Sequence, residues 1–240
     1  MKQNLDSLFN SNILVVVPAR GGSKGIKLKN LQKINGISLV EIAGNVVSEL
    51  DYINQAIVST DHPEIANLAN KSGLDSPFFR PKDLSGDFIS DVEVLTHSLK
   101  EMEKIKKIQY DLIVMLQPTS PTRKPYHVTK AILKLIEKKH DSVITISKLD
   151  SKYHPLKQFL LEDQNIKYFD NKGQTIIARQ QLNDTYVRNG LVYVMTRDCL
   201  INQKKVISEN CGYLIIDEPT ANIDSLEDLK LAQDLISSHT

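Results

Sequence analysis

From residue 13 to residue 147 the chain alternates between short apolar runs and longer stretches with helical spacing. Residues 13–17 (ILVVV) form a continuous aliphatic run, which is typical of a strand buried on both faces. Similar runs occupy residues 53–59, 112–116 and 143–146, and amphipathic stretches lie between them. Strands that alternate with helices form parallel sheets with right-handed crossovers. The alternation therefore predicts the α/β class, with a doubly wound, mostly parallel, Rossmann-like sheet.

The alternation stops between residues 148 and 181. This stretch has no long helical stripe and reads as irregular strands around an Asp-Asn-Lys-Gly turn. Apolar runs resume at 190–195 and 213–216, and a last helix is expected to open at Ser225, where Ser-Leu-Glu-Asp matches a capping box. We therefore expect one α/β domain, formed by residues 1–147 and 182–240, that is interrupted by a small insertion at 148–181.

Three of the predicted strands end in polar loops of unusual composition. The loops are ARGGSKG (19–25), STD (59–61) and QPTSPTR (117–123). In open α/β sheets, ligands bind beyond the carboxyl ends of the strands. We therefore expect the three loops to lie along one rim of the sheet and to form the functional site.

The composition excludes several classes of partner. The formal net charge is only +1, so no global field attracts nucleic acid or a membrane surface. No apolar run is long enough for a membrane span, and the first dozen residues lack the core of a signal peptide. Cys199 and Cys211 form no CxxC pair, and we expect them to be free thiols. These features predict a cytoplasmic protein that binds neither nucleic acid nor membranes.

The loop after the first strand, PARGGSKGIKLKN (18–30), concentrates positive charge. Arg20, Lys24, Lys27 and Lys29 surround three glycines, although like charges repel one another. Glycines such as Gly22 allow backbone N–H groups to approach phosphate oxygens, and lysines neutralise them. The loop matches neither a Walker A motif nor the Rossmann GxGxxG pattern. It predicts a cradle for the triphosphate of a nucleotide, the alternative being a strand-to-helix turn with solvated lysines.

A second interpretation of the same loop is a nucleophile elbow. Gly-Gly-Ser-Lys-Gly fits G-x-S-x-G with Ser23 as nucleophile, and Asp217 or Asp224 followed by His239 would complete a serine hydrolase triad. This interpretation is the weaker one, because the pattern is short and His239 is the penultimate residue, where chains usually fray. It also gives no role to the four cations of the loop, because ester hydrolysis does not require them.

Short motifs along nearly the whole chain resemble those of the acylneuraminate cytidylyltransferases, also called CMP-sialic acid synthetases. No single motif is specific, but their order and spacing are, and the QPTSP, HPLK and RQQL segments are the most distinctive. The matching pieces are Ala19-Arg20, Ser23-Lys24-Gly25, Lys29-Asn30, Asn35-Gly36, Val58-Ser59-Thr60-Asp61, Arg80-Pro81, Gln117-Pro118-Thr119-Ser120-Pro121, His154-Pro155-Leu156-Lys157, Arg179-Gln180-Gln181-Leu182, Asn189-Gly190 and Ile223-Asp224.

The resemblance implies a reaction, a cofactor and a partner. The anomeric hydroxyl of an eight- or nine-carbon acid sugar would attack the α-phosphate of CTP, giving a CMP-sugar and pyrophosphate. The family uses Mg²⁺ and is usually at least dimeric, so a homodimer is expected, with the insertion reaching the active site of the partner subunit. The nearest alternative is another sugar nucleotidyltransferase, such as one acting on Kdo.

The resemblance also implies which residues bind the nucleotide. Arg20, Ser23, Lys24, Lys29 and Asn30 look similar to the triphosphate-binding residues, with Gly22 in the same loop, and Lys29 is the best candidate to stabilise charge at the α-phosphate. Arg80 matches a position near the nucleobase. Ser90 and Asp91 fall where the family contacts cytosine, although Asp91 equally suits the first turn of a helix.

The sugar and metal residues follow in the same way, with two departures from the family. Gln117, Thr119, Ser120, Arg179, Tyr186 and Arg188 are the candidate sugar-binding residues, and Asn222 and Asp224 the candidate metal ligands. Some members carry an arginine at the position of Val187, so the role of Arg188, one residue later, transfers poorly. The family often has Asp-Ile-Asp where this chain has Asn-Ile-Asp. Asp224 with phosphate oxygens can suffice for Mg²⁺, but a non-catalytic CTP-binding protein stays an alternative.

Overall fold

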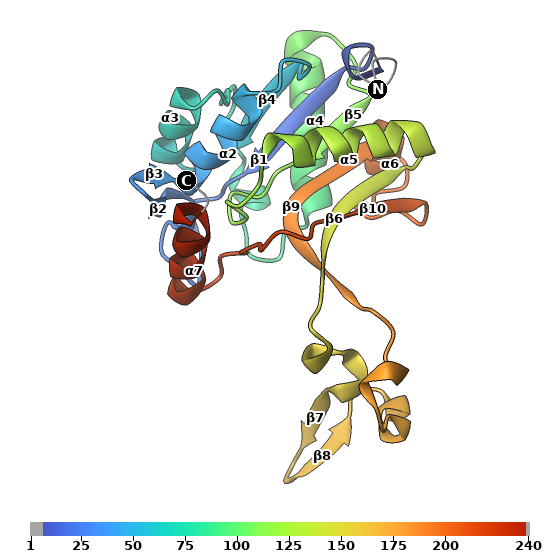
Figure 1. Cartoon of the computed structure of the whole chain (residues 1–240). Coiled ribbons are helices and arrows are strands. Elements are labelled where there is room, and N and C mark those ends of the chain that lie inside the picture. Colours follow the sequence, from blue (N-terminus) through green and yellow to red (C-terminus); the bar gives the residue numbers. More distant parts are fainter. Residues whose placement is uncertain (1–6, 239–240) are drawn as a thin grey trace.

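Six strands form the central sheet of the computed structural model, which describes residues 7–238 (Figure 1). The strand order is β10-β6-β9-β5-β1-β4. The strands are β1 (Ile13–Pro18), β4 (Gln55–Ser59), β5 (Leu112–Met115), β6 (Ser142–Lys148), β9 (Tyr186–Thr196) and β10 (Cys211–Ile215). β1 pairs in parallel with β4 and β5, and β6 pairs in parallel with β10. The predicted α/β class with a mostly parallel sheet is confirmed.

One strand, β9, runs against its neighbours. It is antiparallel to both β5 and β6, which the alternation of strands and helices did not predict. The reason lies in the connection: β6 ends at the rim where the parallel strands end, and no helix carries the chain back across the sheet before β9. The chain therefore re-enters the sheet from the same rim and must run in the opposite direction.

Helices cover both faces of the sheet, because alternate residues of each buried strand point to opposite sides. Val15 and Val17 of β1 belong to one apolar cluster with α2 and α5, whereas Leu14 and Val16 belong to a second cluster with α4 and α6. The helices are α2 (Leu39–Ser48), α3 (Pro63–Lys71), α4 (Asp91–Lys106), α5 (Pro125–Lys138), α6 (Arg197–Ile201) and α7 (Leu226–Ser237), with short 3₁₀ turns η1 (Lys29–Leu31) and η2 (Lys82–Leu84). Within residues 7–238, no helix is both long enough and apolar enough to cross a bilayer.

A third, smaller cluster holds the last helix beside the glycine loop. Ile26 of that loop packs with Ile34, Ile223 and Ala232, which come from a short hairpin, the segment before α7, and α7 itself. The hairpin strands are β2 (Lys33–Ile34) and β3 (Ile37–Ser38). Ser225 caps α7 with the predicted capping box, and Asp228 is its acidic member. The last helix, α7, is thereby held beside the first loop.

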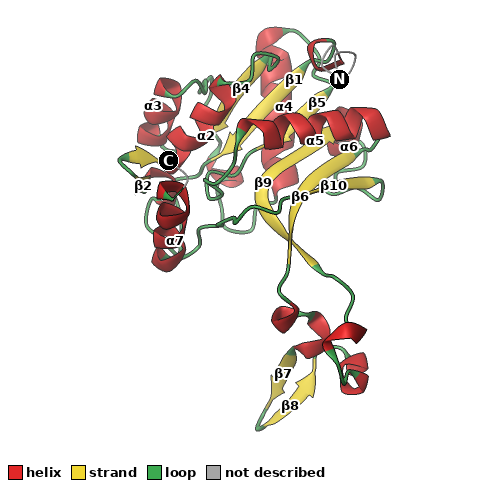
Figure 2. Ribbon diagram, in the orientation of Figure 1, coloured by secondary structure: helices red, strands yellow, loops and turns green. Residues whose placement is uncertain are grey.

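Residues 149–185, called the arm below, project away from the sheet on a two-stranded neck (Figures 1 and 2). The arm contains a hairpin, β7 (Phe159–Glu162) and β8 (Asn165–Tyr168), and four 3₁₀ turns, η3 (Ser151–Tyr153), η4 (Pro155–Lys157), η5 (Asn171–Thr175) and η6 (Arg179–Gln181). The predicted insertion, 148–181, lies almost wholly within it. The ends of the arm differ from those of the predicted insertion, because β6 continues to Lys148 and β9 begins only at Tyr186.

Candidate active site

A cavity of about 390 Å³ lies at the carboxyl ends of β1, β4 and β5. The first and third polar loops line it, and the STD loop lies beside the first, where Asp61 accepts from the Gly21 N–H, as expected of an open α/β sheet. Nine residues singled out in the sequence line this cavity: Arg20, Ser23, Lys24, Lys29, Asn30, Arg80, Asp91, Gln117 and Thr119. Cations from the first loop and polar groups from the third thus face one space.

The glycine loop is held in place from both sides. The Gly21 N–H donates to the Asp61 carboxylate at 2.8 Å, and the buried Asn30 amide donates to the Arg20 carbonyl at 2.9 Å. A Cβ at Gly25 would lie 2.6 Å from the backbone carbonyl of Asp224, so only glycine permits the loop to lie against that segment. The loop is therefore shaped before any ligand arrives.

Asp87 occupies the cationic part of the cavity. Its carboxylate lies 2.8 Å from the Arg20 guanidinium and 2.7 Å from the Lys24 ammonium. These contacts, with Lys24 the larger influence, hold the pKa of Asp87 below its usual value. The sequence analysis missed Asp87, because its loop has no periodicity and the only signal was an acidic residue near a cationic cluster. Its carboxylate neutralises two cations that were predicted to bind phosphates.

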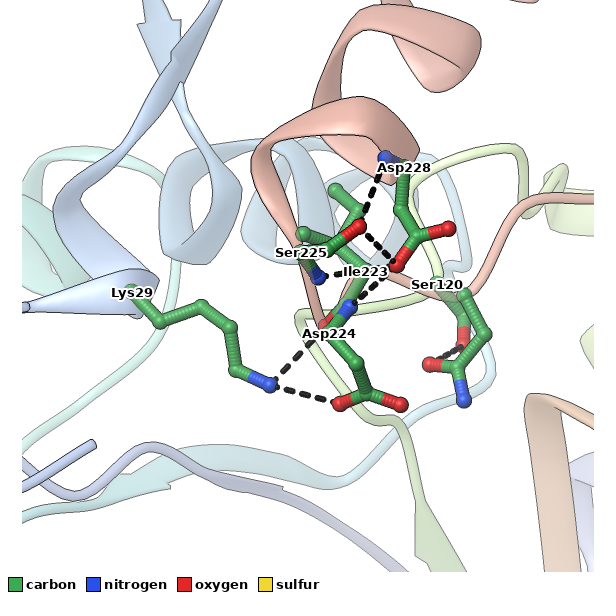
Figure 3. A network of polar contacts seen from close by, with 7 residues as sticks. Lys29, Ser120, Ile223, Asp224, Ser225 and Asp228 are labelled. Atoms are coloured by element: carbon green, nitrogen blue, oxygen red, sulfur yellow. Dashed lines mark hydrogen bonds and ion pairs between the residues drawn. The ribbon is translucent and has the colours of Figure 1, made fainter. Parts of the chain in front are cut away.

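Lys29 connects the first loop to the segment before α7 (Figure 3). Its ammonium donates to the Ile223 carbonyl at 2.8 Å and to the Asp224 carboxylate at 2.9 Å. The Ile223 N–H in turn donates to the Thr119 carbonyl at 2.8 Å, beside the end of β5. The ammonium of Lys29 is largely shielded, whereas the side chain of Asp224 is 77% exposed. The segment thus carries an accessible carboxylate to the edge of the cavity.

The two candidate metal ligands lie on this segment. Asn222 Oδ1 lies 3.4 Å from the Ser120 hydroxyl oxygen, and the Asp224 carboxylate lies against Lys29. Among residues 7–238, no group of three or more His, Cys, Asp or Glu side chains could hold a metal ion by itself. One exposed carboxylate and one amide oxygen fit a Mg²⁺ ion that takes its other ligands from phosphates and water.

Arg80 forms a fixed wall at the inner end of the cavity. Its guanidinium is buried and donates through Nε to the Ser59 hydroxyl at 3.0 Å and through Nη2 to the Ser59 carbonyl. Burial lowers the pKa of Arg80 to about 10, and the Asp61 carboxylate opposes this shift. Ser59, the last residue of β4, thereby holds a buried cation at the cavity.

Ser90 and Asp91 begin α4. The Ser90 hydroxyl is the N-cap, accepting from the Glu93 N–H at 3.3 Å and donating to the Glu93 carboxylate at 2.7 Å, so it is engaged in the capping box. Asp91, the first residue of the helix, lines the cavity. Loss of solvent raises the pKa of its carboxyl, and the charges of Arg188 and Arg80 oppose the rise. Arg188 therefore lies close enough to the cavity to act on Asp91.

The remaining sugar candidates separate into two groups. Gln117 and Thr119 line the cavity, whereas Ser120 is buried behind it and donates to the Asn189 carbonyl at 3.1 Å. Arg179 lies in the arm and Tyr186 at its junction with β9, and both are exposed. Arg179 instead lines a second cavity of about 400 Å³ at the base of the arm. A single chain does not bring Arg179 to the first cavity.

The serine hydrolase interpretation finds no support in these contacts. Ser23 lies among cations, and Asp224, one of its proposed partners, contacts Lys29. The third member, His239, lies outside the described residues. The site instead has the composition of an anion-binding cavity.

Comparison with known proteins is consistent with a cavity that binds an anionic nucleotide. The family described as Cytidylyltransferase matches residues 14–237. The chain is 31% identical to the post-translational flagellin modification protein B of Campylobacter coli, covering 94% of this chain and 95% of that protein. It is also 31% identical to the CMP-N,N'-diacetyllegionaminic acid synthase of Campylobacter jejuni, covering 95% and 96%.

A solved structure, that of CMP:2-keto-3-deoxy-manno-octonic acid synthetase complexed with CTP, shares the fold. Its TM-score is 0.68 at 16% identity, over 96% of this chain and 100% of that one. The match along the sequence, the similarity of the relatives and the cation-lined rim all agree. The chain belongs to the cytidylyltransferase family.

Proposed function

We propose that the protein joins CMP from CTP to the anomeric hydroxyl of a nonulosonic, sialic-type acid and releases pyrophosphate. The observation that carries the proposal is the cavity at the rim, where the cationic glycine loop faces Gln117 and Thr119. Relatives named for legionaminic, pseudaminic and neuraminic acids support this class of sugar. A Kdo-type sugar is the second candidate, because the chain shares its fold with a Kdo-activating enzyme.

In this proposal the glycine loop binds the triphosphate. Arg20, Ser23 and Lys24 hold the outer phosphates, and the Asp87 carboxylate leaves Arg20 and Lys24 when the nucleotide enters. Lys29, held near the cavity by Ile223 and Asp224, stabilises the charge that develops on the α-phosphate. The sugar hydroxyl attacks that phosphorus, the bond to the β-phosphate oxygen breaks, and pyrophosphate leaves. Arg80 and Asp91, at the far end of the cavity, are the proposed contacts of cytosine.

Mg²⁺ is the proposed cofactor. Asp224 and Asn222 would hold it together with phosphate oxygens, and when bound it would neutralise phosphate charge and orient the triphosphate. The Asp224 carboxylate lies 2.9 Å from the Lys29 ammonium and is 77% exposed, so it would remain accessible to a metal ion while it holds Lys29.

The proposed partner is a second copy of this chain. Arg179 is too far along the arm to line the cavity of its own chain, and its guanidinium is suited to bind the sugar carboxylate in a bidentate manner. The arm also exposes Leu161 at 81% and Ile177 at 93%, which a second subunit would cover. We propose a homodimer in which each arm reaches the active site of the partner, in the cytoplasm, where CTP is available.

A sugar screen tests the proposal. The purified protein is incubated with CTP, Mg²⁺ and each of a panel of synthetic nonulosonic acids and Kdo, and the products are identified by mass. The expected result is a CMP-sugar, together with pyrophosphate that forms only when all three components are present. Product from Kdo alone would favour the second candidate. CTP binding without any product would identify a non-catalytic nucleotide-binding protein.

A further inference from the structure

Arg123 is a buried arginine without an acidic partner. It follows the QPTSP run in the loop before α5, and only 4% of the residue is exposed. Burial lowers its pKa to about 9, with no neighbouring carboxylate opposing the shift, and Nη1 has no hydrogen-bond partner among the described residues. Burying a charge in this way is strongly unfavourable. The unfavourable burial of Arg123 therefore suggests that its remaining hydrogen bonds serve a purpose.

The guanidinium bridges two carbonyls of neighbouring strands. Nε donates to the Leu191 carbonyl, and Nη2 donates to the Gln117 carbonyl at 2.6 Å. The paired residues of β5 and β9 end with Met115 opposite Tyr193. Extending the same register by two residues places Gln117 opposite Leu191. The planar fork of Arg123 thus joins a facing pair two residues beyond the point where backbone pairing stops.

This bridge lies behind one wall of the proposed sugar site. Gln117 lines the cavity, and Gly190, next to Leu191, lies against the Gln117 side chain. A Cβ at Gly190 would be 2.8 Å from Gln117 Oε1, and the φ of +74° at Gly190 already disfavours other residues. The direction of the Gln117 amide therefore depends on the distance between the two chain segments at Gln117 and Leu191. The Arg123 bridge sets this distance.

We propose that Arg123 is a positioning residue: its guanidinium replaces the missing backbone bonds between β5 and β9 and so fixes the Gln117 amide at the sugar side of the cavity. The inference rests on the proposed function, because it takes the sugar as the group that Gln117 contacts. Lysine cannot substitute, since its ammonium is a flexible point charge and cannot hold two carbonyls in one plane.

The first test compares Arg123→Lys with the wild type and with Lys124→Gln, a change at the exposed neighbour. Arg123→Lys keeps the charge and loses the fork. We expect its KM for the acid sugar to rise about 10-fold or more, with the KM for CTP unchanged and Lys124→Gln like the wild type. Full activity of Arg123→Lys would show that a positive charge is enough at this position and that the planar fork is not needed, which would overturn the proposal. Failure of the lysine variant to fold would also overturn it, because the residue would then serve the fold.

A double-variant cycle tests whether Arg123 acts through Gln117. If it does, Arg123→Lys combined with Gln117→Ala is no worse than Gln117→Ala alone. Losses that add would show that Arg123 acts by another route and would overturn the proposal.

Hydrogen exchange separates this inference from the proposed function, because it needs no turnover. Arg123→Lys should accelerate amide exchange in residues 116–120 and 189–192 and leave α2 and α3 unchanged. Unchanged exchange in these two segments would overturn the bridge. If the wild type used no sugar in the screen, the proposed function would fail while the exchange result still decided the bridge.

Discussion

The rim of the sheet and the arm differ in how many of their side chains are held in place by contacts within the chain. At the rim, polar side chains are held by contacts within the chain, as Lys29 is by Ile223 and Asp224 and Arg80 is by Ser59. In the arm, only His154 and Gly173 are buried, and no arm residue belongs to the three apolar clusters. The cavity is thus lined by residues of one chain, whereas the arm exposes apolar side chains that the proposed second subunit would cover.

This contrast follows from the number of layers around each part. The strands under the rim are covered by helices on both faces, so their loops start from fixed points. The arm has a single two-stranded hairpin, and an isolated hairpin is at best marginally stable in water. A dimer would supply the missing layer. The contrast can be tested by changes that affect one region and spare the other.

The largest expected effect is at the rim. Lys29→Ala removes the cation proposed to act at the α-phosphate, and turnover should fall by about 10²-fold or more. The thermal unfolding midpoint should fall by only a few degrees, because the fold loses only the two hydrogen bonds that Lys29 donates to Ile223 and Asp224. Pyrophosphate release is the measurement, and Lys33→Ala, an exposed lysine of β2, is the control. A fully active Lys29→Ala would remove Lys29 from the mechanism.

The next effect is in the arm. Leu161→Asp places a charge on an apolar side chain that is 81% exposed in the single chain, and it should weaken dimerisation by roughly 30-fold or more. Light scattering gives the mass, and Leu231→Asp, at a half-exposed leucine of α7, is the matched control. CTP binding should survive in Leu161→Asp, since the cavity is formed by the other region. A variant that stays dimeric would show that the hairpin lies outside the interface.

A smaller effect concerns the carboxylate inside the cavity. Asp87→Asn removes the charge that pairs with Arg20 and Lys24, leaving both cations to the nucleotide. Because exposed ion pairs are weak, the Kd for CTP should fall by only about 3- to 10-fold. Calorimetry with Mg²⁺ measures this, and tripolyphosphate should show the same trend. Weaker binding by Asp87→Asn would mean that Asp87 assists the nucleotide directly.

The smallest effect is a pH dependence of the α/β body. His127 is 1% exposed, and burial lowers its pKa to about 4, with Lys124 and Arg123 adding to the shift. The unfolded chain then binds more protons than the folded one between about pH 6.5 and the folded pKa. The free energy of unfolding should therefore decrease in this window as pH falls, by roughly 3 kcal/mol in total.

His127→Gln tests this pH dependence. Glutamine can keep the hydrogen bond that His127 accepts from the Lys124 N–H, because it is a natural capping-box residue at this position. Denaturant unfolding at pH 7 and pH 5 should show a smaller difference for this variant. An unchanged difference would assign the acid sensitivity to other groups.

Much of the sheet was predictable, because its strands are buried and their apolar runs are continuous. The strand at residues 13–17 and the loop after it follow from local sequence, since Ile13–Pro18 is covered on both faces. The direction of β9 was not predictable. Its apolar residues fit either direction, and only the exit of the arm at the carboxyl end of β6 decides it.

The site was predictable where charge and glycine occur together in the sequence. Arg20, Lys24 and Lys29 lie within one short loop, so their meeting in one cavity needed only the strand before them. Asp87 and Arg123 were missed, because each acts across a long sequence separation: Asp87 on Arg20, and Arg123 on Leu191. Local sequence patterns do not predict contacts between residues that are far apart in the chain.

The neck of the arm contains one irregularity with a wide reach. The pairing of β6 and β9 shifts between Ile144 and Ile146, and beyond the shift Lys148 lies opposite Tyr186. Between these pairs β6 has one residue, Thr145, whereas β9 has four, 189–192. Because side chains alternate along a strand, removing one residue from 189–192 would turn the side chains of the β9 half of the neck to the opposite face. Everything distal to it, Arg179 included, would then be rotated relative to the rim. The direction in which the arm points therefore depends on the number of residues at this bulge, whereas substitutions in the hairpin change the contacts of the arm and leave its direction unchanged.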